Sequence, residues 1–105
     1  MWVRSAYWVG RPKVGAEAAL RNAVDKDLVP TLESLPGVIG ARALWARRLE
    51  NGALPIACQI IIEFPSMADL DRMLASPERA AMRAQVPALL EMFEGTVSHI
   101  DFEVA

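Results

Sequence analysis

The most apolar stretch of the chain runs from Ile56 to Phe64 and reads Ile-Ala-Cys-Gln-Ile-Ile-Ile-Glu-Phe. Isoleucine dominates it, and runs rich in β-branched residues are typical of buried strands. Pro65 and Ser66 follow at once and end the pattern. We therefore expect a central strand over 56–64, with the other segments arranged to cover its two faces.

Two helical patterns flank this strand. Leucine and valine recur at about every fourth position between Ala16 and Leu35, which predicts an amphipathic helix. Pro30 lies inside that helix and removes one backbone hydrogen bond, so a kink is expected there. The second helix is expected to begin at Ser66 and to restart at Ser76-Pro77, because serine caps helices and proline suits the first helical position.

Three further strands complete the pattern. Trp2–Val9 and Thr96–Val104 alternate as strands do, and Gly95 is expected to close the second helix. Val38–Leu49 is followed by Asn51-Gly52, the pair most typical of a hairpin turn, because both residues tolerate positive φ. The strand over 38–49 should therefore pair antiparallel with the central strand.

The element order is strand, helix, strand, strand, helix, strand. We interpret residues 1–105 as one domain of the α+β class, with a ferredoxin-like βαββαβ fold. That fold has a four-stranded antiparallel sheet with two helices on one face. The opposite face of the sheet would remain uncovered in a single copy.

The last strand has two unlike sides, since Ile100 and Phe102 alternate with His99 and Asp101. If its apolar side faces the helices, large apolar groups of the other strands lie on the uncovered face. Tryptophans left in water would forfeit several kcal/mol of burial, so we predict a homodimer in which two uncovered faces stack. The predicted interface residues are Trp2, Arg4, Trp8, Trp45, Gln59, Ile61 and Glu63.

Composition narrows the function classes. The formal net charge is −2 without a basic block, so nucleic acid is not expected as a partner. Cys58 is the only cysteine, which excludes a disulfide within the chain and favours a reducing compartment. The sequence lacks both a signal-peptide pattern and an apolar run of the roughly 18 residues that a membrane span needs. We expect a soluble, cytoplasmic protein that does not bind a membrane.

Two short segments resemble those of a known family. The run Pro30-Thr-Leu-Glu-Ser-Leu-Pro-Gly37 before the second strand and the helix restart Leu74-Ala-Ser-Pro-Glu78 are similar to those of EthD-like proteins, within the dimeric α+β barrel superfamily. The resemblance implies a homodimeric barrel, a small pocket in each subunit and a role near the metabolism of small hydrophobic or aromatic compounds. EthD-like sequences often carry a histidine two residues before the helix proline, where this chain has Leu28. Chemistry that depends on that histidine is therefore absent or moved.

The candidate catalytic residues are His99, Asp101 and Tyr7. His99 and Asp101 lie two apart on one side of a strand, and a nearby carboxylate raises the pKa of an imidazole. The alternative is a polar cluster with Arg4, Gln59 and Glu63 that fixes the register of the dimer. One histidine and one cysteine on opposite faces are too few ligands for a metal, so neither a metal nor another cofactor is expected.

A ligand pocket is predicted between the sheet and the helices. Arg42 would orient an anionic group there, and the alternative is that its stem packs while its charge reaches water. The pocket would accept a small hydrophobic or aromatic ligand. Its predicted residues are Arg42, Ser98, Leu44, Ile60, Met82, Val86, Leu90 and Phe93. An enzyme and a non-catalytic binding or interaction protein both remain open at this point.

Overall fold

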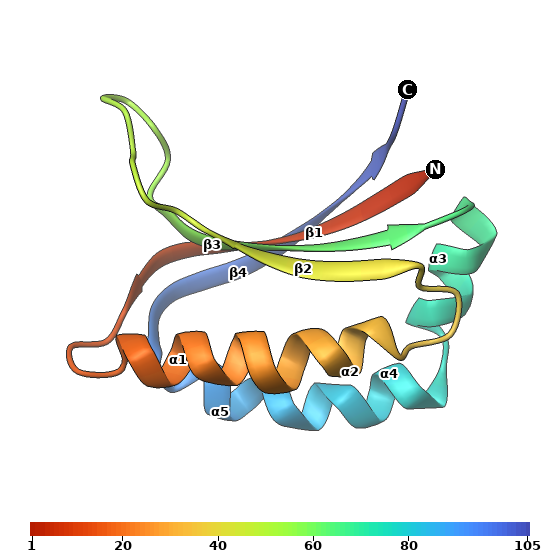
Figure 1. Cartoon of the computed structure of the whole chain (residues 1–105), viewed down its shortest axis with the longest axis horizontal. Helices are drawn as coiled ribbons and strands as arrows, with labels where there is room; N and C mark the ends of the chain where they lie inside the picture. The colour runs from red at the N-terminus through yellow and green to blue at the C-terminus, as the bar shows by residue number, and fades with distance from the viewer.

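The computed structural model describes residues 1–105 and contains one four-stranded antiparallel sheet with helices on one face (Figure 1). The strands are β1 (Trp2–Pro12), β2 (Gly40–Trp45), β3 (Ile56–Phe64) and β4 (Phe93–Glu103), in the spatial order β2-β3-β1-β4. The ferredoxin-like order predicted from the sequence is therefore confirmed, including the antiparallel pairing of β2 with β3.

The first helical run consists of α1 (Glu17–Ala23), a π-helical segment η1 (Val24–Leu28) and α2 (Val29–Glu33). Pro30 cannot donate to the carbonyl of Lys26, and the chain widens into a π turn just before it. Within that turn the backbone N–H of Val29 bonds to the carbonyl of Val24. The irregularity expected at Pro30 is thus a π segment one turn ahead of it.

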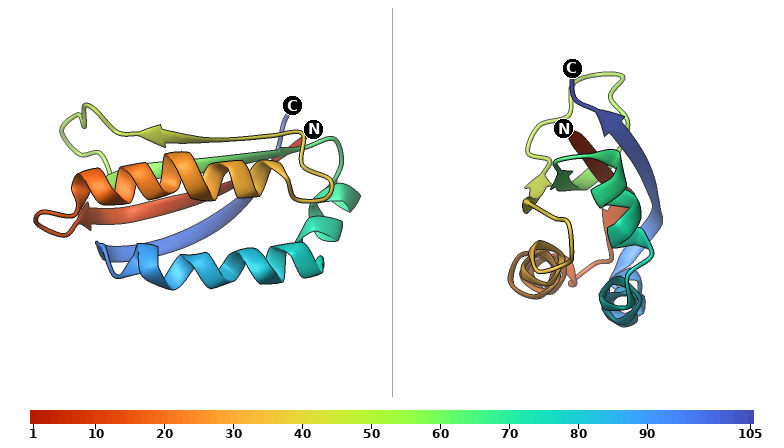
Figure 2. Two further views of the ribbon diagram at one scale, coloured as in Figure 1. Left: turned by 60° about the horizontal axis from the view of Figure 1, so that its bottom comes forward. Right: turned by 90° about the vertical axis from the view of Figure 1, so that its right-hand side faces the viewer.

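The second helical run is α3 (Met67–Leu74), α4 (Pro77–Met82), the 3₁₀ segment η2 (Arg83–Gln85) and α5 (Val86–Leu90). Ser66 caps α3 by accepting a hydrogen bond of 3.1 Å from the N–H of Asp69. Ser76 caps α4 in the same way, 3.1 Å from the N–H of Arg79. Both predicted caps are confirmed. The two runs lie side by side under the sheet (Figure 2).

Strand β4 begins at Phe93, earlier than the predicted Thr96, because Gly95 continues the strand instead of ending the helix. Gly10 and Gly95 are opposite each other on β1 and β4, with φ of +134° and +149°. A Cβ on either residue would overlap a backbone carbonyl of the other strand. Only glycine permits this close approach, so the long β1–β4 ribbon depends on both.

Strand β2 is shorter than the predicted 38–49, and residues 46–55 form an arm that rises from the sheet on the side away from the helices (Figure 1). The turn at Asn51-Gly52 is present at its tip, with Gly52 at φ +88°. The N–H of Ala53 bonds to the carbonyl of Glu50 across this turn at 2.9 Å. The hairpin connection is therefore longer than a two-residue loop.

The core lies between the sheet and the helices. Its residues show that the predicted facing of β1, β2 and β4 is wrong. Trp8 is only 3% exposed and packs edge-on against Phe93 at 5.3 Å between ring centroids. The prediction that the tryptophans face away from the helices is wrong, because the apolar side of β4 is not its helix side. The predicted facing of β3 is confirmed, with Ile60 on the helix side and Ile61 on the opposite side. The helix side carries Trp2, Arg4, Ala6, Trp8, Ala41, Ala43, Trp45, Ile60, Ile62, Phe64, Val97, His99 and Asp101.

The other side of the sheet, which we call the open face, has a small polar network at its centre. Gln59 donates hydrogen bonds to Ser5 at 3.2 Å and to Tyr7 at 3.4 Å. Arg42 pairs with Glu63 at 3.2 Å. Large apolar side chains surround this network and are exposed. They are Leu44, Ile100, Phe102 and Val104.

No helix of the structure has both the length and the apolar character that crossing a membrane requires.

Candidate functional site

A cavity of about 170 Å³ lies between the sheet and the two helical runs. Its walls come from β1, β3 and β4 above and from both helical runs below, and ten of its fourteen lining residues are hydrophobic. Ligand pockets are typically apolar with a few polar groups that converge, and this cavity has that character. The lining residues are Arg4, Ala6, Trp8, Leu28, Leu32, Ile60, Ile62, Met73, Arg79, Met82, Arg83, Val86, Val97 and His99.

The cavity is polar at one end and apolar at the other. Along β1, Arg4 lies opposite Asp101 on β4, and Trp8 lies opposite Val97. Residues four apart on a strand are separated by about 13 Å. His99, opposite Ala6, lies midway between the charged end and the apolar end.

Three arginines gather at the polar end: Arg4, Arg79 and Arg83, which we call the arginine cluster. Arg4 forms an ion pair of 2.9 Å with Asp101. Burial lowers the pKa of Arg79, and the charges of Arg83 and Arg4 lower it further. The three guanidinium groups therefore repel one another with a single carboxylate among them.

His99 lines the cavity from β4, not the space between two stacked sheets. Burial against the cavity wall lowers the pKa of its imidazole, and the arginine cluster lowers it further, whereas Asp101 opposes the shift. Asp101 raises this pKa as predicted from the sequence, but burial and the arginine cluster outweigh it, so the predicted net rise is wrong. At neutral pH the imidazole is uncharged and able to accept a proton.

Trp8 forms part of the apolar end. Its indole Nε1 is buried and has no hydrogen-bond partner within the chain. Buried N–H groups are normally paired, and an unpaired one costs about 1–3 kcal/mol. This donor is thus a polar group that the fold itself leaves unsatisfied beside the cavity.

The structure brings some of the predicted site residues together and separates others. Ile60, Met82 and Val86 line the cavity between sheet and helices, where they were expected, and His99 lines it too, although it was expected between two sheets. Asp101 lies on the same side of the sheet and reaches it through Arg4. The pocket prediction fails for the residues of the open face, because the facing of their strands was inverted. These are Tyr7, Ser98, Arg42 and Leu44.

Two further predicted pocket residues lie elsewhere. Phe93 is buried behind Trp8, and Leu90 is 43% exposed on the outside of α5. Of the predicted interface residues, Gln59, Ile61 and Glu63 do lie on the open face. Trp2, Arg4, Trp8 and Trp45 lie on the helix side instead, so their assignment to a sheet-stacking interface is wrong.

Sequence reasoning missed Arg79 and Arg83 as site residues. Their signal was present, because two arginines four apart on one helix face, following the Ser76 cap, are a like-charge pair that destabilises a helix. Leu28, at the position where EthD-like proteins often have histidine, lines the same cavity as His99. The cavity's single imidazole therefore enters from the sheet and not from the first helical run.

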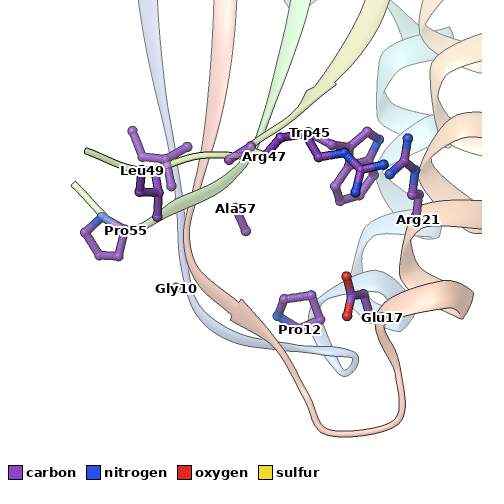
Figure 3. Close-up of a pocket in the computed structure, with 11 residues that line it drawn as sticks. Gly10, Pro12, Glu17, Arg21, Trp45, Arg47, Leu49, Pro55 and Ala57 are labelled. Atoms are coloured by element: carbon purple, nitrogen blue, oxygen red, sulfur yellow. The ribbon is translucent and has the colours of Figure 1, made fainter. Parts of the chain in front are cut away.

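A second hollow, the end cleft, has a volume of about 370 Å³ and lies between α1 and the base of the 46–55 arm (Figure 3). Arg21 lies over the ring of Trp45 at 5.4 Å, and Trp45 donates a hydrogen bond of 2.9 Å to Asp25. Arg21 also pairs with Asp25 at 3.5 Å. Since these groups satisfy one another, and only five of its eleven lining residues are hydrophobic, the end cleft is the weaker candidate.

The lone cysteine does not supply a nucleophile. Cys58 is buried under the helices, and burial raises the pKa of its thiol to about 12, with Asp25 adding to the shift. A thiol with such a pKa is almost wholly protonated at neutral pH, and the thiolate is the reactive form. No three His, Cys, Asp or Glu side chains are grouped in a way that could hold a metal ion.

No model of a known protein family and no curated protein matches this sequence. Several solved structures, in contrast, match the fold of this chain. A crystal structure of an ethyl tert-butyl ether D (EthD) family protein from Bacillus halodurans C-125 superposes with a TM-score of 0.78 at 11% identity, over 100% of both chains. A candidate antibiotic biosynthesis monooxygenase from Deinococcus radiodurans gives 0.70 at 12% identity, over 100% of this chain and 93% of that one.

A dimeric ferredoxin-like protein of unknown function from Jannaschia sp. CCS1 gives a TM-score of 0.66 at 18% identity, over 99% of this chain and 100% of that one. Identities this low establish a shared fold and leave activity open. The chain thus has the ferredoxin-like α+β fold, and its resemblance to EthD-like proteins is confirmed at the level of that fold.

Proposed function

We propose that this protein binds a small hydrophobic or aromatic metabolite in the cavity between sheet and helices and catalyses proton transfer on it without a cofactor. The observation that carries this proposal is the cavity itself, in which hydrophobic walls surround one uncharged histidine. Its volume of about 170 Å³ is below the range of about 300–1,000 Å³ typical of drug-sized ligands, so the ligand should be small.

In this proposal His99 is the general base. A neutral imidazole with a lowered pKa accepts a proton from an acidic C–H or O–H group of the bound ligand. The electron pair of the broken bond stays on the ligand as an enolate or phenolate. The arginine cluster lies beside His99 and would stabilise that negative charge.

The proposal includes a homodimer formed through the open face. Leu44, Ile100, Phe102 and Val104 are exposed there, and such apolar patches usually mark an interface. The Jannaschia protein, which has the same fold, is described as dimeric. Two copies related by a twofold axis would each offer the same face, which is the commonest arrangement of soluble oligomers.

A second function, binding without catalysis, is favoured by one observation. Asp101 is held by Arg4 and is therefore not free to orient His99 as the acid partner of a catalytic pair. Leu28 likewise supplies no second imidazole to the cavity. Under this alternative the protein would bind and protect or transport the same class of ligand.

The test is a titration with naphthol, a small aromatic probe that is mainly neutral at pH 7, followed by two-dimensional amide NMR. We expect shifts confined to cavity residues. Val86→Phe, which fills the cavity, should abolish them, whereas the matched variant Leu90→Phe on the exposed side of the same helix should not. If naphthol binds equally well to the two variants, it does not bind in the cavity, and the proposed site is rejected. Solvent deuterium exchange into an acidic bound ketone, lost in His99→Gln, separates catalysis from binding alone.

A further inference from the structure

We propose that the natural ligand of the cavity is a carboxylic acid with an apolar, aromatic body, whose carboxylate is bound by Arg79 and Arg83. This inference rests on the proposed function and specifies its ligand class. It starts from the distribution of charge at the polar end of the cavity. It then uses the apolar end to fix the rest of the molecule.

Arg79 and Arg83 differ from most arginines of the chain in having no carboxylate partner. Five others form ion pairs with an aspartate or glutamate within 3.5 Å: Arg4, Arg11, Arg21, Arg42 and Arg72. Arg47 and Arg48 are exposed on the projecting arm. Only Arg79 and Arg83 combine a missing partner with a place in the wall of an apolar cavity.

The fold holds these two charges together at a cost. Arg79 lies in α4, and Arg83 is the first residue of η2, four positions later. Residues four apart are neighbours on a helix surface, so the two arginines lie on one side of the second helical run. Arg4 faces them from β1, and the lowered pKa of Arg79 reflects both its burial and this repulsion. A bound carboxylate would remove the repulsion and accept two charge-assisted hydrogen bonds, for which guanidinium geometry is well suited.

The opposite end of the cavity fixes the rest of the ligand. Trp8, Leu28, Val86 and Val97 present hydrocarbon surface and no charge. An inorganic anion would leave that surface empty, whereas an aromatic acid would cover it while its carboxylate stayed at the arginines.

The experiment compares naphthoate with naphthamide, which has nearly the same shape and no charge. Both are titrated into the full chain and into Arg79→Gln, Arg83→Gln and Arg72→Gln. Arg72 is the matched control, because it pairs with Asp69 on α3 and lies outside the cavity. Circular dichroism melts show whether each variant is folded. Arg83 is exposed, so Arg83→Gln should fold and carry the test even if Arg79→Gln does not fold.

We expect wild-type protein to bind naphthoate about tenfold or more tightly than naphthamide, as one charged hydrogen bond would give. Arg79→Gln and Arg83→Gln should each weaken the affinity for naphthoate about tenfold and change the affinity for naphthamide by less than about threefold. Arg72→Gln should leave both affinities unchanged. The Trp8 indole N–H signal should shift with naphthoate.

Three results would overturn the inference. Equal affinity for acid and amide, with naphthol still sensitive to Val86→Phe, would reject the acid and leave the proposed function standing. Equal weakening by Arg72→Gln and Arg83→Gln would show non-specific attraction to charge and would likewise reject it. If naphthol, naphthoate and naphthamide all fail to bind, the proposed function and the inference fail together.

Discussion

Phe102 offers the sharpest test of the homodimer. It lies on the open face of β4, opposite Val3 of β1, and 40% of it is exposed. In a dimer that stacks two open faces this exposed part would be buried. Replacing it with alanine removes most of the apolar surface that it would bury and creates no cavity in the core of the single copy.

The size of the effect follows from the exposed area. A phenylalanine presents about 200 Å² in all, so the exposed 40% corresponds to about 80 Å². Burying that area gains about 2 kcal/mol at 25 cal/mol per Å². Because a twofold axis places Phe102 in the interface twice, the loss doubles to about 4 kcal/mol per dimer. This raises the dissociation constant of the dimer about a thousandfold.

Sedimentation equilibrium over a range of concentrations measures this constant directly. Leu90→Ala is the matched control, since Leu90 is 43% exposed but lies on the outside of α5. We expect Phe102→Ala to dissociate at concentrations where wild type and Leu90→Ala are dimers. The reasoning is refuted if wild type is monomeric at high micromolar concentration, or if Leu90→Ala is the variant that dissociates.

Three other predictions test the fold and its titrating groups. Gly95→Ala should destabilise the protein by at least about 2 kcal/mol in urea unfolding, since a positive φ and a clash with Val9 act together. Gly40→Ala, with no positive φ and no contact nearer than 3.8 Å, should be close to neutral; equal losses would contradict the Gly10–Gly95 argument. Cys58 should resist thiol reagents at about pH 8 until the protein unfolds, and rapid native labelling would refute its burial. Because the pKa of His99 is lowered from 6.5, the unfolded chain binds its proton first, so stability should fall as pH drops below about 6.5. His99→Gln should flatten this part of the stability–pH curve, and an unchanged curve would exclude His99 as its source.

The sequence alone predicted the elements and their order. The isoleucine run of β3, the leucine repeat of the first helical run and the two serine caps are local signals, set by neighbours within a few residues. The antiparallel pairing of β2 with β3 also followed from the turn at Asn51-Gly52. The fold class depends on little else, so it was accessible without coordinates.

The facing of the strands was not accessible in the same way. In β4, Ile100 and Phe102 were expected toward the helices because they are the apolar side, yet they lie on the open face. The rule that apolar residues face the helices fails where the other face of the sheet is also apolar. His99 and Asp101 were therefore placed between sheets, although they lie on the helix side.

The candidate site was consequently predicted only in part. Ile60 and Val86 line the cavity in which they were expected, His99 lines it although it was expected between sheets, and Arg79 and Arg83 were not considered. The sequence determined which side chains alternate along each strand and which recur along each helix. Only the tertiary structure decided which alternating set meets the helices, because one strand shifted by one residue exchanges its two faces without changing its local pattern. The gathering of Arg4, Arg79 and Arg83 around one histidine is a product of that packing, since these residues come from three separate elements.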